Sequence, residues 1–303
     1  MAPRDDPGGG FAQAGFREGR LTVRDGLRLF YRDYGDPLAA GTAVLCLPGL
    51  ARNSHDFHRL ALRLSADRRV VCPDYRGRGR SDRASSWHGY TPQNDLDDLR
   101  QLLAATGLRR VVVIGTSYGG LLAMGLGVVA PRALAGVVLN DIGPDVSAAA
   151  EARILAHLAE GRPQPDWAAA IAYLKSLLQH PPFRTDADWE EFARGTYYEP
   201  AAPGAPLRAA WDTAIVRALR QGGGERPDLW ALFRSLRDVP VLLIRGELTD
   251  ILSEDSAARM AALHPAFTRV TVPGVGHAPM LTEPECVQAI DDFLERVPAA
   301  PYR

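Results

Sequence analysis

The chain has 303 residues, enough for one large domain or for one domain that carries an insertion. Its 35 basic and 36 acidic residues nearly cancel, so the overall charge favours neither a nucleic acid nor an anionic membrane as partner. Its three cysteines cannot all pair, and it has no apolar run as long as a signal peptide or a membrane span. We therefore expect a cytoplasmic protein with a small-molecule partner, and the sequence leaves its oligomeric state open.

The first half of the chain alternates between strands and helices. After a segment expected to be disordered, residues 1–20, the turn pair Asp25-Gly26 favours a hairpin at the sheet's edge. Apolar runs then predict buried strands, and amphipathic stretches between them predict helices. The strands are at residues 43–47, 70–72, 111–114 and 136–139, and the helices include residues 56–65 and 92–105. This alternation is typical of an α/β fold, a mostly parallel sheet with helices on both faces.

The alternation is interrupted after residue 143. For about ninety residues only helical patches separated by Pro and Gly are found, and four of the five tryptophans fall there. Strand and helix patterns then resume to the end of the chain. We predict a core of residues 21–143 and 236–303 and an inserted helical cap, or lid, of residues 144–235.

The sequence GTSYG, residues 115–119, follows a strand of β-branched residues. Gly115 and Gly119 flank Ser117 two residues away on each side, so the chain can turn sharply into a helix without crowding the serine. The start of that helix offers free backbone N–H groups and the positive end of its dipole, both suited to a developing oxyanion. The pattern indicates a nucleophile, although an ordinary Gly-rich turn or a phosphate cradle would also account for the five residues alone.

A serine nucleophile needs a base and a group that orients the base. His277 follows the last predicted strand, and Asp250 follows the strand before it. Because the carboxyl ends of parallel strands lie along one rim of a sheet, we expect Ser117, Asp250 and His277 to lie there together.

With these motifs in place, the chain resembles a capped α/β-hydrolase over residues 21–297. LPGL, DYRGRGRSD, GTSYGG, NDIGP, GELTDILS and GVGHAPML are similar to landmarks of that superfamily in position and order. The resemblance implies Ser117 as nucleophile, His277 as general base and Asp250 as its orienting acid. It further implies an oxyanion hole made by the backbone N–H groups of Leu50 and Tyr118, and a pocket floor shaped by residues 74–82.

Two departures from the family's pattern bear on the site. Pro48 precedes Gly49 where many relatives have a histidine, so only the backbone donor of Leu50 remains at that position. Asp250 comes four residues after Gly246, whereas many relatives have three. Asp141 follows the preceding strand, where some members carry the acid, and is the alternative candidate.

The resemblance implies a cofactor-independent hydrolase. We expect it to cleave a small apolar or aromatic ester or lactone through an acyl-serine. Hydrolysis of a carbon–carbon bond in a β-diketone-like substrate and a non-catalytic, ligand-binding role stay open as alternatives. The histidines show no metal-ligand spacing, so we expect neither metal nor cofactor. Trp189, Tyr197 and Tyr198 of the cap are the predicted substrate-binding residues.

Overall fold

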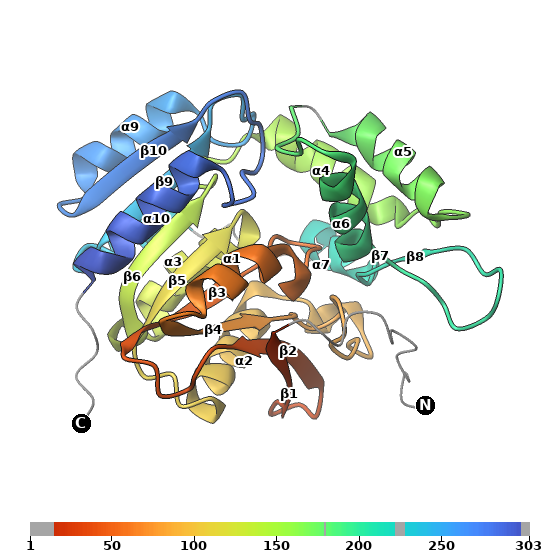
Figure 1. Ribbon diagram of the computed structural model, residues 1–303, viewed down its shortest axis with the longest axis horizontal. Helices are drawn as coiled ribbons and strands as arrows, with labels where there is room; N and C mark the ends of the chain where they lie inside the picture. The colour runs from red at the N-terminus through yellow and green to blue at the C-terminus, as the bar shows by residue number, and fades with distance from the viewer. Residues whose placement is uncertain (1–14, 179, 222–227, 298–303) are drawn as a thin grey trace.

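The computed structural model describes residues 15–178, 180–221 and 228–297. In this part of the chain eight strands form one sheet, in the order β1-β2-β4-β3-β5-β6-β9-β10 (Figure 1). Its strands are β1 (Phe16–Thr22), β2 (Arg28–Tyr34), β3 (Gly41–Leu47), β4 (Arg68–Pro73), β5 (Val111–Thr116), β6 (Leu134–Asn140), β9 (Val241–Gly246) and β10 (Phe267–Val272). β1 pairs with β2 and β2 with β4 in antiparallel register, and all other pairings are parallel. The predicted fold class is confirmed.

Helices cover both faces of this sheet because side chains along each buried strand alternate between two apolar layers. Val111 and Val113 of β5 face one core, and Val112 and Ile114 face the other. The first core is covered by α2 (Pro92–Ala105), α3 (Tyr118–Val129), α8 (Leu229–Arg234) and α9 (Glu254–Leu263), and the second by α1 (His58–Leu64) and α10 (Pro284–Arg296). Short 3₁₀ turns precede α1, α2 and β6, at η1 (Ser54–Phe57), η2 (Trp87–Gly89) and η3 (Pro131–Ala133).

The predicted disordered segment ends too late. β1 begins at Phe16, so residues 16–20 are part of the sheet, and residues 1–14 lie outside the described residues. β1 shows little alternation of burial along its length, because it is the outermost strand and mostly faces solvent. Its pairing with β2 brackets the predicted turn at Asp25-Gly26.

Between β6 and β9 the chain forms a group of helices beyond one end of the sheet (Figure 1). They are α4 (Ala148–Glu160), α5 (Trp167–Leu177), α6 (Asp186–Thr196) and α7 (Ala214–Gln221), with a two-residue strand pair, β7 (Tyr197–Tyr198) and β8 (Arg208–Ala209). α8 also falls in the segment predicted as cap, but its Phe233 joins the core beside α3. The layer above the rim therefore ends before α8.

Backbone and side-chain contacts tie this layer to the sheet. The amide of Asn53 donates to the carbonyl of Gly195 at 2.7 Å, and Gly79 N–H donates to Ala210 at 2.7 Å. Arg59 of α1 pairs with Asp188 of α6 at 2.7 Å. Burial opposes the charge of Asp188, but hydrogen bonds from Arg59 and the backbone of residues 184 and 185 lower its pKa to about 2. The contact is therefore charged at any ordinary pH.

Candidate active site

Ser117 occupies the sharp turn between β5 and α3. Its φ of 52° is in the left-handed region, which a non-glycine residue adopts only where the surroundings enforce it. The surroundings do so here, since a Cβ on Gly115 would lie 2.5 Å from the backbone of Gly119. A Cβ on Gly119 would lie 2.0 Å from the carbonyl oxygen of Leu47. Both glycines are thus required for the close approach that lifts the serine out of the sheet.

The loop after β3 lies directly beside this serine. A Cβ on Gly49 would be 3.9 Å from the Cβ of Ser117, so the N–H of Leu50 is carried on backbone next to the nucleophile. Tyr118 is the first residue of α3, where a backbone N–H has no acceptor within the helix. These are the two predicted oxyanion donors, and the structure brings their segments together.

Two buried side chains hold the carbonyl groups of that loop from below. The hydroxyl of Tyr75 donates to the carbonyl of Pro48 at 3.1 Å, and Nε of Arg78 donates to the carbonyl of Leu50 at 2.9 Å. Arg78 in turn lies 3.6 Å from Asp95, whose other partner is the hydroxyl of Tyr118 at 2.7 Å. Burial raises the pKa of Asp95, while Arg78 and Tyr118 favour its charged form. Residues 74–82 were expected to form the pocket floor, but Tyr75 and Arg78 instead support the loop that carries Leu50.

His277 lies in the loop between β10 and α10, and its partner is Asp141. Nδ1 of the imidazole is 2.7 Å from Oδ2 of the carboxylate. Since an ionised carboxylate only accepts hydrogen bonds, Nδ1 carries the proton and Nε2 is left as the basic nitrogen. The histidine loop is also fixed to the end of β6, because the amide of Asn140 donates to the carbonyl of Pro279 at 2.8 Å and to Thr116 Oγ1 at 3.0 Å.

Asp141 is fully buried and its carboxylate accepts two further hydrogen bonds. Gly246 N–H donates to Oδ1 at 2.9 Å, and the hydroxyl of Thr249 donates to Oδ2 at 2.6 Å. The φ of Asp141 is 57°, a conformation that Asp tolerates better than most residues. These three contacts orient the carboxylate toward His277.

The prediction that Asp250 contacts His277 is wrong. The side chain of Asp250 is 48% exposed and forms an ion pair with Arg153 of α4. The loop after β9 still serves the histidine, but through the N–H of Gly246 and the hydroxyl of Thr249. The one-residue excess between Gly246 and Asp250 was the feature of the sequence that pointed to this outcome.

Ser117 and His277 line one pocket of about 260 Å³ beneath the helical layer. Its walls are largely apolar side chains, and besides His277 the charged or titratable ones are Arg52, His55, Asp56 and Glu191. The apolar side chains from the helical layer are Ile154, Leu158, Leu178, Pro182, Phe183 and Phe192. Ile154 and Leu158 are four residues apart on α4, a spacing that places both on one helix face.

The three predicted substrate-binding aromatics do not line this pocket. Tyr197 is buried within the helical layer, in an apolar cluster with Leu174 and Leu207. Trp189 packs against Phe183 with ring centroids 4.6 Å apart, and Tyr198 lies in β7. The sequence showed an aromatic-rich segment but not which rings pack within it and which face the serine.

Arg52 is a pocket residue that the sequence did not indicate. Its Nε donates to Asp56 at 2.7 Å, and its guanidinium stacks 4.2 Å from the centre of the Phe192 ring. His55 beside it is neutral at ordinary pH, because burial and the nearby Arg32 lower its pKa to about 4. In the part of the chain that the structure describes, no three His, Cys, Asp or Glu side chains are grouped closely enough to hold a metal ion.

Comparison with known proteins shows the family of this chain. A model of the alpha/beta hydrolase family matches residues 44–289. The chain belongs to this family. It is 32% identical over 280 residues to the 3-hydroxybutyrate-oligomer hydrolase of Cupriavidus necator, covering 88% of this chain and 92% of that protein. It is 28% identical to the 2-(acetamidomethylene)succinate hydrolase of Mesorhizobium japonicum, over 84% of this chain and 89% of that one.

Solved structures show the same relationship. The crystal structure of an α/β hydrolase from Novosphingobium aromaticivorans matches with a TM-score of 0.86 and 41% identity, covering 94% of this chain and 99% of that one. The named relatives are hydrolases, so the protein is assigned to hydrolases that act on small molecules. A search of the described helices finds none that combines the length and the apolar character needed to cross a bilayer.

Proposed function

We propose that the protein is a cofactor-independent serine hydrolase that cleaves a carboxylic ester of apolar character through an acyl-serine intermediate. One observation carries the proposal. Ser117 in its strained turn shares a largely apolar pocket with His277, and Nδ1 of His277 is hydrogen-bonded to the buried Asp141. The likeness to a hydrolase of 3-hydroxybutyrate oligomers, which are esters, supports it.

The contacts suggest a role for each group. Oγ of Ser117 attacks the ester carbonyl as Nε2 of His277 takes the hydroxyl proton, and Asp141 stabilises the imidazolium that forms. The N–H groups of Leu50 and Tyr118 face the negative oxygen of the tetrahedral intermediate. The C–O bond then breaks, and His277 returns its proton to the departing alcohol.

The second half of the cycle uses the same groups. A water molecule attacks the acyl carbonyl while His277 accepts one of its protons, and the C–O bond to Ser117 breaks with that proton returning to Oγ. The carboxylic acid leaves and the enzyme is regenerated. Burial of Asp141 and its three hydrogen bonds keep the imidazole in the tautomer that both halves require.

Turnover of p-nitrophenyl butyrate and labelling by a fluorophosphonate probe test the proposal together. The parent protein should hydrolyse the ester and carry one label on the peptide that contains Ser117. Ser117→Ala should abolish labelling and lower kcat/KM by several orders of magnitude. Ser176→Ala, which removes an exposed hydroxyl from α5, is the matched control and should behave as the parent. A folded protein that neither turns over esters nor reacts with the probe would be a ligand-binding member of the family instead.

A further inference from the structure

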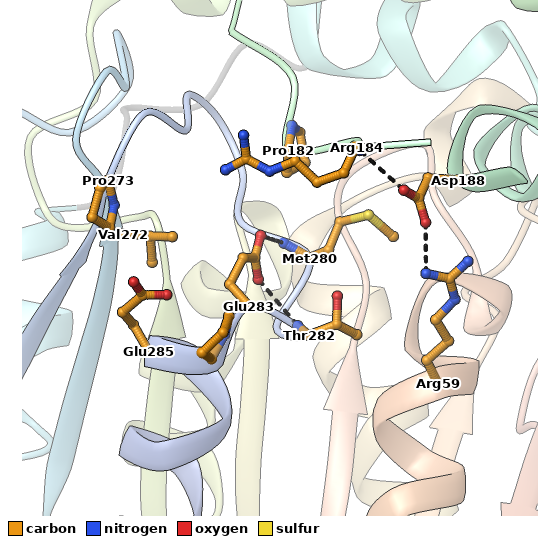
Figure 2. A pocket seen from close by; sticks show the side chains of 11 residues that line it. Arg59, Pro182, Arg184, Asp188, Val272, Pro273, Met280, Thr282, Glu283 and Glu285 are labelled. Atoms are coloured by element: carbon orange, nitrogen blue, oxygen red, sulfur yellow. Dashed lines mark hydrogen bonds and ion pairs between the residues drawn. The ribbon is translucent and has the colours of Figure 1, made fainter. Parts of the chain in front are cut away.

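A second and larger pocket of about 480 Å³ adjoins the one that contains Ser117. Figure 2 shows it between the beginning of α1, the end of β10, the beginning of α10 and the segment that enters α6. Pro182 and Met280 line both pockets, so they form the shared wall. The two spaces are neighbours, and a ligand that extends past these two side chains would occupy both.

The volumes indicate an extended ligand. Pockets for small molecules usually measure about 300–1,000 Å³. The pocket that contains Ser117, here called the inner pocket, has 260 Å³ and falls below that range. Together with the second, outer pocket its volume falls within the range. The inner pocket therefore suits the group next to the scissile bond, and the outer pocket offers room for the remainder of a longer chain.

Existing contacts already occupy some of the charged groups of the outer pocket. Arg59 is held by Asp188 at 2.7 Å and also by Glu191. The carboxylate of Glu283 accepts the N–H groups of Met280 at 2.9 Å and Thr282 at 3.1 Å, which fixes it at the start of α10 (Figure 2).

Two charged side chains at the pocket remain without such contacts. The guanidinium of Arg184 and the carboxylate of Glu285 have no ion-pair partner among the described residues, and both are exposed. In Figure 2 the Arg184 side chain extends across the upper side of the pocket, above Glu283 and Glu285. The pocket thus offers hydrogen-bond donors on one side and acceptors on the other.

This charge pattern distinguishes between kinds of chain. Two basic side chains, Arg59 and Arg184, face three acidic ones, Asp188, Glu283 and Glu285, so the lining has one negative charge in excess. That excess disfavours a free carboxylate. It suits an uncharged chain whose ester carbonyls accept from a guanidinium and whose hydroxyl end donates to a carboxylate.

We propose that the outer pocket binds the distal, hydroxyl-terminated part of a hydroxyacid oligoester whose scissile bond lies at Ser117. This inference rests on the ester hydrolysis proposed above and names its substrate class. Arg184 contacts ester carbonyls, and Glu283 or Glu285 accepts the terminal hydroxyl. Apolar surface from Pro182 and Pro273 packs against the hydrocarbon part of the chain.

The test compares a long and a short ester in the same variants. The long probe is the linear trimer of 3-hydroxybutyrate as its methyl ester, and the short one is p-nitrophenyl butyrate. Thr282→Trp fills the outer pocket, because Thr282 lines that pocket and not the inner one. Arg184→Ala removes the guanidinium without adding bulk. Arg296→Ala removes an exposed guanidinium at the opposite end of α10 and is the matched control.

We expect Thr282→Trp and Arg184→Ala each to lower the ratio of kcat/KM for the trimer to that for the butyrate by tenfold or more. Acetylation of the trimer's hydroxyl should lower the same ratio for the parent, and Arg296→Ala should leave it unchanged. If the parent cleaves both esters and neither variant changes the ratio, the outer pocket is not a subsite. If the parent cleaves no ester and Ser117 takes no phosphonate label, the proposed hydrolysis fails and this inference with it.

Discussion

Asp141 is the residue whose replacement tests the arrangement of the site most directly. Asp141→Asn keeps the size of the side chain and replaces one acceptor oxygen with an NH₂ donor. In the parent, both carboxylate oxygens accept, from Gly246 N–H at 2.9 Å, Thr249 Oγ1 at 2.6 Å and His277 Nδ1 at 2.7 Å. Whichever way the amide is turned, its NH₂ group faces a donor.

Two amide orientations are possible, and both have a cost. If NH₂ faces His277, the imidazole must present an unprotonated Nδ1, which places the proton on Nε2 and removes the base. If it faces Gly246, a buried N–H loses its acceptor, at a cost of about 1–3 kcal/mol in stability. In serine proteases the equivalent change lowers turnover by about 10⁴-fold, which corresponds to about 5.5 kcal/mol of transition-state stabilisation. We expect a loss of that order here.

The assay is kcat/KM for p-nitrophenyl butyrate, with circular dichroism and thermal unfolding to show that each variant is folded. Asp250→Asn is the matched control, since it removes the same charge from a half-exposed ion pair with Arg153. Such pairs contribute about 0–1 kcal/mol, so this variant should retain activity within about threefold of the parent. The reverse ranking, with a folded but inactive Asp250→Asn and an active Asp141→Asn, would refute the assignment.

Two further predictions concern the pocket wall and the response to acid. Phe192→Ala enlarges the inner pocket and should shift the preference among p-nitrophenyl esters toward longer acyl chains by about tenfold. Trp167→Ala lies outside that pocket and should leave the ranking of esters as it is. An unchanged ranking in both variants would exclude Phe192 from acyl selection. Burial and Arg32 lower the pKa of His55 to about 4 in the folded protein. In the unfolded chain this histidine is protonated at a higher pH, so the free energy of unfolding falls as the pH drops from about 6.5 toward 4. Between pH 7 and 4.5 the free energy of unfolding should decrease by at most about 2.5 kcal/mol for this reason. In urea unfolding, His55→Gln should abolish this decrease, whereas His88→Gln, at an exposed site, should retain it.

The sequence predicted the core of the fold because its information there is local. Runs such as residues 111–114 are apolar and β-branched, and Gly115 and Gly119 mark a turn that only small residues permit. Ser117 directly follows β5 and His277 lies in the loop after β10, so their positions after strands were readable from the sequence, and both line one pocket.

The acid that contacts His277 was not predictable in the same way. Asp141 and Asp250 both follow strands that end at the rim, and the choice between them depends on the path of a loop. β6 lies directly between β5 and β9, so an acid at its end is a neighbour of both the serine strand and the loop after β9. In the loop after β9, Asp250 pairs with Arg153, while the hydroxyl of Thr249 donates to Asp141. Such a path is a property of the tertiary structure.

The pocket wall was missed for a different reason. The sequence showed where the large aromatic residues are but not which way their side chains face. In a small helical layer, large rings are needed to form the apolar core of that layer. Tyr197 serves that purpose. Phe183 and Phe192 line the pocket that contains Ser117, and α6 is held in place by Asn53 and Arg59, which follow Leu50 in the chain.

The contacts of Asn53 and Arg59 with α6 separate the residues that shape the substrate pockets from those that carry out the proposed chemistry. Asn53 lies three residues after Leu50, so the segment that carries this proposed oxyanion donor also binds the end of α6. The segment entering α6 supplies Pro182 and Phe183 to the inner pocket and Pro182 and Arg184 to the outer one. Changes at these side chains alter the space for substrate without affecting the hydrogen bonds from Tyr75 and Arg78 to the carbonyls of Pro48 and Leu50. The fold thus allows the walls of both pockets to vary while Ser117, His277 and their supports stay in place.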